Sequence, residues 1–153
     1  MAAVFLAAVN AKYIHSNLAV YSMKSYCREY EKYVEIGEYT INQQKDEILK
    51  SIYKKQPKVL CFSCYIWNIS FVKELICDLK KILPQTVIWA GGPEVSYDAE
   101  KFLQELPEVT GVMCGEGEQT FLELVQHYVH EKEEDALADI KGIVFQKNGE
   151  IVR

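Results

Sequence analysis

The sequence predicts an α/β domain in which a parallel β-sheet carries helices on both faces. Short apolar runs, typical of strands buried on both faces, alternate with longer segments whose apolar residues recur every three or four positions. Glycine or proline follows several of these segments, where a strand or helix would end. With 153 residues, 49% of them hydrophobic, the chain suits one domain with its own core.

The first half of the chain is expected to hold three strands and two helices. They are a strand over 4–9, a helix over 17–33, a strand over 33–41, a helix from about 42 to 57 and a strand over 59–64. Asn42 is expected to cap the second helix and Pro57 to end it. The strands over 4–9 and 59–64 are almost wholly apolar, which places them at the centre of the sheet.

The second half continues the alternation and then departs from it. The expected elements are a helix over 71–83, a strand over 86–90, a short helix over 102–106, a strand over 110–114, a helix over 121–129 and a hairpin of 140–145 with 150–153. Asn148-Gly149 is a strong signal for a two-residue hairpin turn. Because proteins seldom end inside a strand, we expect the sequence to be part of a longer protein.

Charge and cysteine usage exclude several classes of protein. The formal net charge of −5 does not favour binding to nucleic acid, which would need a basic face. The apolar run near the N-terminus has no basic residue before it and is too short to cross a membrane, so we interpret it as a strand. Five cysteines, an odd number mostly within apolar runs, do not form a disulfide framework and indicate a reducing, cytoplasmic location.

Four loops are expected to meet at one edge of the sheet, because the carboxyl ends of parallel strands share an edge and ligands bind there. They are 10–17, 63–68, 91–94 and 115–118, all rich in glycine, hydroxyl, amide or aromatic side chains. Their glycines either let a ligand approach the backbone closely or only turn the chain, and both interpretations stay open. The sequence contains neither a dinucleotide-binding fingerprint nor a Walker phosphate-binding motif.

These loops carry a resemblance to a known family. The segments are Asn10-Ala-Lys-Tyr-Ile-His-Ser-Asn17, Cys61-Phe-Ser-Cys-Tyr-Ile-Trp-Asn68, Ala90-Gly-Gly-Pro-Glu94 and Gly115-Glu-Gly-Glu118. In this order they resemble the N-terminal cobalamin (B12)-binding domain of B12-dependent radical SAM proteins, over essentially the whole chain. The resemblance implies a flavodoxin-like α/β/α fold with a five-stranded parallel sheet in the order 2-1-3-4-5, followed by a C-terminal β-hairpin. Residues 1–135 would form this domain, and 136–153 a hairpin linker toward an absent radical SAM domain.

The resemblance also implies a set of cofactor-binding residues. They are Asn10, Tyr13, His15, Ser16, Asn17, Ser63, Tyr65, Trp67, Asn68, Gly91, Gly92, Pro93, Gly115, Glu116 and Gly117. In the family, the corrin ring rests on the carboxyl edge of the sheet and the nucleotide tail enters it. Ser63 matches a serine near the phosphate or ribose of the tail, and Gly91 and Gly92 match a pair that makes room for it. Because Gly92 is expected in a loop, leucine there should block the tail and leave the fold intact.

Two motifs found in related proteins are missing. The Asp-x-His-x-x-Gly motif of histidine-ligating domains is absent, since Tyr13 and Val20 stand where it needs Asp and Gly around His15. Neither a catalytic residue nor a metal ligand is therefore expected here, and the cobalt is expected to have no protein histidine. The Cys-x-x-x-Cys-x-x-Cys motif is also absent. A 4Fe–4S cluster and S-adenosylmethionine would then belong to the parent enzyme and not to this chain.

The resemblance thus implies a cobalamin-binding module without turnover of its own. Its partner would be a radical SAM domain of the same polypeptide, catalysing methyl transfer or another radical reaction on an unknown substrate. A different class stays open: a flavodoxin-like domain that binds flavin or a nucleotide, or that serves only for docking. The isolated domain is expected to self-associate through an exposed edge with Tyr13, Tyr65 and Trp67.

Other residue types that often carry chemistry are interpreted more simply. Cys61 is expected in the core, while Cys64, at the end of its strand, is open to a role near the ligand. His127 and His130 are expected on a solvated helix face. Trp89, inside a strand, is expected in the core. The carboxylates Glu94, Glu116 and Glu118 lack the nucleophile or metal that acid–base chemistry needs.

Overall fold

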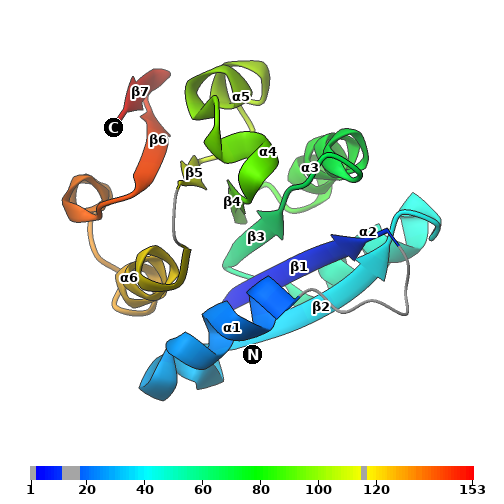
Figure 1. Cartoon of the computed structure of the whole chain (residues 1–153), viewed down its shortest axis with the longest axis horizontal. Helices are drawn as coiled ribbons and strands as arrows, with labels where there is room; N and C mark the ends of the chain where they lie inside the picture. The colour runs from blue at the N-terminus through cyan, green and yellow to red at the C-terminus, as the bar shows by residue number, and fades with distance from the viewer. Residues whose placement is uncertain (1–2, 12–17, 115–116) are drawn as a thin grey trace.

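A seven-stranded sheet runs through the residues that the computed structural model describes, which are 3–11, 18–114 and 117–153. The strands are β1 (Val4–Asn10), β2 (Val34–Thr40), β3 (Val59–Ser63), β4 (Val87–Gly91), β5 (Gly111–Met113), β6 (Ile143–Lys147) and β7 (Glu150–Val152). Their order is β2-β1-β3-β4-β5-β6-β7, and the first five are parallel. The predicted 2-1-3-4-5 arrangement is therefore confirmed. Figure 1 shows β2 and the β6–β7 hairpin at opposite ends of the sheet.

Helices cover both faces of this sheet, as the alternation of strands and helices predicted. One face carries α2 (Lys45–Lys55), α3 (Ile69–Ile82), α4 (Pro93–Ser96) and α5 (Ala99–Glu105). The other face, called here the α1/α6 face, carries α1 (Leu18–Tyr26), α6 (Gly117–Val129) and the 3-10 helices η1 (Arg28–Tyr33) and η2 (Glu134–Asp139). Side chains of β1 alternate between the two cores, with Phe5 on the first face and Leu6 on the α1/α6 face. All of β1 is buried, which explains its unbroken apolar run.

The C-terminal hairpin belongs to the same sheet. Strand β6 pairs antiparallel with β5, with Val112 opposite Val144, and β7 pairs antiparallel with β6. Val144 and Phe145 are buried on opposite faces of the sheet, one in each core. The expected hairpin therefore extends the parallel sheet by two antiparallel strands.

Local details differ from the sequence predictions for identifiable reasons. The helix expected over 17–33 is divided, because Arg28 adopts a left-handed backbone with φ of +53° and the chain continues as η1. Asn42 does not cap α2, which begins at Lys45 after Gln44; the Asn42 backbone N–H instead donates to Thr40 Oγ1 at 3.2 Å. Within the described residues, no helix combines the length and the apolar character needed to cross a bilayer.

Candidate functional site

The carboxyl ends of four parallel strands place small residues in one row on the α1/α6 face. Ala8 pairs with Ser63, Ser63 with Gly91, and Gly91 with Met113. Because side chains alternate along a strand, these residues share a face with the next row inward, where Leu6 pairs with Cys61 and Cys61 with Trp89. A helix that packs over Ala8, Ser63 and Gly91 meets little side-chain volume, so space remains between it and the sheet.

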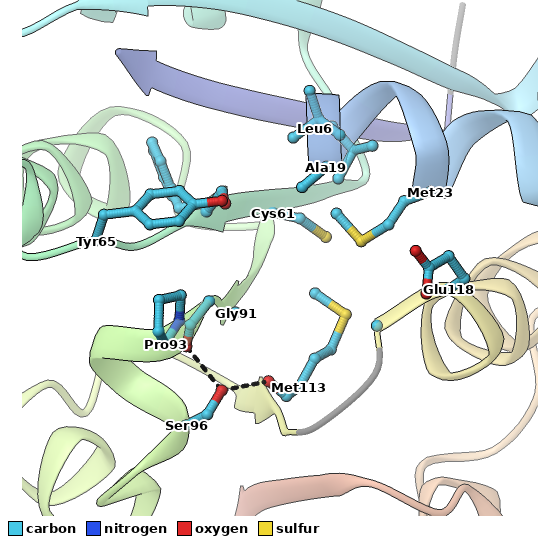
Figure 2. Close-up of a pocket in the computed structure, with 15 residues that line it drawn as sticks. Leu6, Ala19, Met23, Cys61, Tyr65, Gly91, Pro93, Ser96, Met113 and Glu118 are labelled. Carbon is cyan, nitrogen blue, oxygen red and sulfur yellow. Dashed lines mark hydrogen bonds between the residues drawn. The ribbon is translucent and has the colours of Figure 1, made fainter. Parts of the chain in front are cut away.

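A cavity of about 440 Å³ occupies this space. Figure 2 shows it enclosed by the strand ends, α1, the start of α6 and the loops that follow β3 and β4. Its lining comprises Leu6, Ala19, Val20, Met23, Cys61, Phe62, Ser63, Tyr65, Gly91, Gly92, Pro93, Ser96, Met113, Gly117 and Glu118. The volume lies in the range of sites that hold small molecules and parts of cofactors. Six of these residues were predicted from the sequence: Ser63, Tyr65, Gly91, Gly92, Pro93 and Gly117.

The two glycines after β4 have different roles. A Cβ on Gly91 would stand on the cavity side, at 3.5 Å from the Met113 methyl group, which is an ordinary contact. A Cβ on Gly92 would overlap the carbonyl oxygen of Cys64, and the φ of Gly92 is +103°. The expectation that leucine at position 92 leaves the fold intact is therefore wrong, because the backbone of Cys64 leaves no room for a side chain there. Gly91 is the glycine that keeps the cavity open.

The loop after β3 is held by Asn68, whose side chain is almost wholly buried. Its Nδ2 donates to the carbonyl oxygens of Val9 at 2.9 Å and Ser63 at 3.1 Å, and its Oδ1 accepts from the Tyr65 backbone N–H at 2.8 Å. Asn68 does not line the cavity. We interpret it as the residue that ties the ends of β1 and β3 together and positions the aromatic side chains between them.

Those aromatic side chains form a stacked pair at the cavity mouth. The rings of Tyr65 and Trp67 lie 4.5 Å apart and are nearly parallel, with 4° between their planes. Tyr65 lines the cavity, while Trp67 is about half exposed and Ile66 is largely exposed. The pair presents a flat apolar surface beside the opening, suited to a large planar ligand.

Two polar side chains, those of Ser96 and Glu118, also line the cavity. The Ser96 hydroxyl lies 2.7 Å from the carbonyl oxygen of Gly92 and 3.3 Å from that of Met113, which joins α4 to the ends of β4 and β5. Glu118, in the first turn of α6, accepts a hydrogen bond from Ser22 Oγ at 3.4 Å and so links α6 to α1. Both hydrogen-bond networks hold the cavity walls at a fixed spacing.

Cys61 is buried in the core on the α1/α6 face, as expected, and also borders the cavity. Cys61 lines the cavity, whereas Cys64 is fully buried on the other face of the sheet and does not line it. Burial raises the pKa of each thiol to about 12, so both stay protonated at neutral pH. Of the two cysteines, Cys61 and not Cys64 is therefore the one that a ligand in this cavity would meet.

Other predicted site residues lie apart from this cavity or outside the described residues. Asn10 lines a separate cavity with Glu38, Tyr39, Thr40 and Gln43, and its Nδ2 is 3.4 Å from Glu38 Oε1. Trp67 does not line the main cavity, but its ring stacks on that of Tyr65, which does. The predictions for Tyr13, His15, Ser16, Asn17, Gly115 and Glu116 fall on residues that the structure does not describe.

The two histidines at the C-terminal end of α6 and just after it, His127 and His130, differ in burial. His130 is exposed, and its Nε2 lies 2.7 Å from the Tyr30 hydroxyl. His127 is buried, with 4% of its surface exposed, and its Nδ1 has no hydrogen-bond partner among the described residues. Burial and the nearby Lys132 and Lys58 lower its pKa. The expectation of a solvated face is therefore wrong for His127, which is buried.

Trp89 is fully buried, as expected, and its Nε1 donates to the Tyr128 hydroxyl at 2.9 Å. The described residues contain no group of three or more histidine, cysteine or acidic side chains placed to hold a metal ion.

Several lining residues were missed by the sequence analysis. On the strands, Leu6 and Cys61 lie two positions before Ala8 and Ser63, so the period of two residues on one sheet face was the available signal. On α1, Val20 and Met23 lie three positions apart and therefore face the sheet together. No sequence signal distinguishes Ser96 from an ordinary exposed helical serine.

The chain is similar in sequence to several known proteins. A family model described as the B12 binding domain matches residues 6–125. The chain is 36% identical over 70 residues to the cobalamin-dependent radical SAM methyltransferase TokK of Streptomyces tokunonensis. The matched segment covers 46% of this chain and 10% of that protein. It is 22% identical over 107 residues to the anaerobic magnesium-protoporphyrin IX monomethyl ester cyclase of Cereibacter sphaeroides, covering 70% of this chain and 18% of that protein.

Two solved structures share the fold. The cobalamin-dependent S-adenosylmethionine radical enzyme OxsB, with aqua-cobalamin and S-adenosylmethionine bound, superposes with a TM-score of 0.77 at 20% identity, over 97% of this chain and 22% of that one. A cobalamin-binding protein from Desulfitobacterium hafniense gives a TM-score of 0.60 at 14% identity, over 83% of this chain and 58% of that one. The chain thus spans only a small part of its larger relatives. With a family model that matches most of its length, the chain belongs to the B12-binding domain family.

Proposed function

We propose that this chain binds cobalamin, with the nucleotide tail of the cofactor in the cavity and the corrin ring on the carboxyl edge of the sheet. The observation that carries the proposal is the gap that Gly91 leaves between Ser63 and Met113. Any side chain on Gly91 would enter the cavity. Glycine inside a buried strand weakens the packing, and it is often found where a ligand approaches the backbone closely.

The shape of the cavity fits one part of cobalamin. The corrin ring with its amide arms is too large for a space of about 440 Å³, whereas the tail, a phosphate, a ribose and a benzimidazole in series, is slender. A ring outside the mouth would meet the stacked Tyr65–Trp67 pair. The Ser63 side chain is buried and lines the cavity at the carboxyl end of β3, where phosphate or ribose would lie.

We propose further that the chain serves as the cobalamin-binding module of a B12-dependent radical SAM enzyme, whose reaction is a methyl transfer or a related radical reaction. Bound cobalamin supplies a cobalt centre that can carry and transfer a methyl group. The relatives named above, in which the matching segment is a small part of a longer chain, support a radical SAM domain of the same polypeptide as the partner. The five free cysteines are in keeping with a reducing, cytoplasmic setting.

The exposed rim of the cavity also suits contact with another protein surface. Ile66 and Tyr97, the sequence neighbours of the lining residues Tyr65 and Ser96, are 79% and 96% exposed, and Trp67 is half exposed. Apolar patches of this kind favour association when nothing covers them. We therefore propose that the isolated chain self-associates through this rim. Sedimentation at high concentration should detect a dimer that added cobalamin weakens, and a monomer at all concentrations would contradict this.

The colour of the cofactor provides the test of cobalamin binding. Purified chain mixed with hydroxocobalamin and passed over a desalting column should retain the pink cofactor in about equimolar amount. FMN, the ligand of many proteins with this fold, should pass through. Folded protein that emerges colourless, or that retains FMN and not cobalamin, would contradict the proposal.

A further inference from the structure

The cavity has two chemically different ends. Its polar lining side chains, Ser63, Tyr65, Ser96 and Glu118, come from the outer row of the sheet, from the loops that follow the strands and from the start of α6. The inner end, defined here by Leu6, Val20, Met23 and Cys61, lies one row deeper between β1, β3 and α1. Leu6, Val20 and Cys61 are each at most 2% exposed.

The inner end offers no strong hydrogen-bonding side chain. Its heteroatoms are the Cys61 thiol and the Met23 thioether, and both are weak hydrogen-bond partners. Figure 2 shows the sulfur-bearing side chains of Cys61, Met23 and Met113 directed toward the middle of the cavity. The backbone does not compensate there, because Cys61 is paired in register with β1 on one side and β4 on the other.

The order of groups in a cobamide tail decides which part reaches this end. With the corrin ring held at the mouth, phosphate and ribose come first and the lower base, at the tip of the tail, lies deepest. Dimethylbenzimidazole presents a fused benzene ring with two methyl groups, which suits leucine, valine and sulfur side chains. Adenine, the base of pseudocobalamin, presents an exocyclic amine and ring nitrogens that would lose water there and gain no partner.

We propose that the inner end of the cavity selects the lower base of the corrinoid, favouring an apolar benzimidazole over a purine, with Cys61 as a specificity-determining residue. This inference rests on the proposed function, because it takes the tail to lie in the cavity. It concerns the choice among corrinoids, which cobalamin binding alone leaves open.

Binding of three corrinoids to the wild-type chain tests the inference. Dissociation constants for hydroxocobalamin, pseudocobalamin and cobinamide, which lacks the tail, are measured by absorbance or calorimetry. Cobalamin should bind at least tenfold more tightly than pseudocobalamin and also more tightly than cobinamide. Equal binding of cobalamin and pseudocobalamin within about threefold, tighter pseudocobalamin binding, or cobinamide binding as tight as that of cobalamin would overturn the inference. Failure of all three to bind would instead contradict the proposed function.

A pair of cysteine variants places the selectivity at the inner end. Cys61→Ser replaces a weak hydrogen-bonding group with a hydroxyl that can pair with a purine, so the preference for cobalamin should fall at least threefold. Cys77→Ser, on α3 and outside the cavity, should keep the wild-type preference. Thermal unfolding of both variants checks that they are folded. If folded Cys61→Ser keeps the full preference, or Cys77→Ser loses it, the assignment to Cys61 is overturned.

Discussion

Ser63 and Gly91 lie directly opposite each other in β3 and β4, on the sheet face that α1 and α6 cover. Ser63 carries a small hydroxyl side chain and Gly91 none, although both are buried at the carboxyl end of central strands. This pairing opens the sheet surface toward α1 and creates the outer half of the cavity.

Filling the cavity from Gly91 should abolish tight binding of cobalamin. In Gly91→Leu the new Cβ makes only ordinary contact with Met113 and the rest of the side chain would occupy the cavity, so the fold should remain. Affinity for hydroxocobalamin should fall at least tenfold, ~1.4 kcal/mol. Ala138→Leu, which adds similar bulk at an exposed position of η2, should bind like the wild type. Unchanged affinity in a folded Gly91→Leu would show that the tail does not pass this strand.

The neighbouring glycine should behave differently, because the backbone of Cys64 leaves no room for a side chain on Gly92. In Gly92→Ala the methyl group would overlap the Cys64 carbonyl oxygen and lie 2.9 Å from the Cys64 nitrogen, at a φ of +103°. The free energy of unfolding should drop by ~1–3 kcal/mol in urea titrations. Gly91→Ala is the matched control and should change it by less than ~0.5 kcal/mol. Equal stability of the two variants would contradict this division of roles.

Stability should depend on pH through His127. Burial lowers the pKa of its imidazole in the folded chain, while the unfolded chain protonates it near pH ~6.5. The unfolded state therefore binds more protons below that pH, and this contribution to stability, present above pH ~6.5, is lost as the pH falls toward the lowered folded pKa. The loss of unfolding free energy between about pH 7.5 and 5.5 should be smaller in His127→Gln than in the wild type. An equal or larger loss in the variant would disprove this role.

The cobalt of bound cobalamin should carry no histidine of this chain. His127 lies toward the far end of α6 from the cavity, roughly 15 Å along the helix from Gly117, and His130 lies further still. Of the three histidines, His15 alone belongs to the edge loop expected near the corrin, and no Asp precedes it by two positions to orient it.

Electron paramagnetic resonance of the cob(II)alamin form provides the measurement. A nitrogen ligand splits each cobalt line into three, and we expect unsplit lines in the wild type and in His15→Ala alike. Triplets that disappear in His15→Ala would identify His15 as the ligand. Triplets that persist there would mean that the cofactor keeps its own base on the cobalt or that another histidine binds, and either result would refute the expectation.

Much of the fold could be predicted because its signals are local. The apolar runs of β1 and β3 and the stripe of Val72, Leu75 and Ile76 on α3 each follow from one segment of sequence. The place of the hairpin could not be predicted, because β6 pairs with β5 through contacts between distant segments. The break at Arg28 was also missed, since a left-handed arginine has no signature in the sequence.

The candidate site could be predicted only at its outer end. Ser63, Gly91 and Gly92 stand at strand ends, where glycine and hydroxyl residues are conspicuous. The inner end was missed because Leu6 and Cys61 look like core residues and are indeed buried. What makes them line a cavity is the distance at which α1 packs over the row of Ala8, Ser63 and Gly91, and that distance is a tertiary property.

A crystal structure of the chain with hydroxocobalamin tests the central claim most directly. We predict electron density for the nucleotide tail between α1 and the sheet, in contact with Ser63 and Gly91. The corrin ring should lie against Tyr65 and Trp67, with the benzimidazole away from the cobalt. A cofactor bound elsewhere on the protein, or one whose tail stays folded onto the cobalt while the cavity beside Gly91 holds only water, would contradict the account.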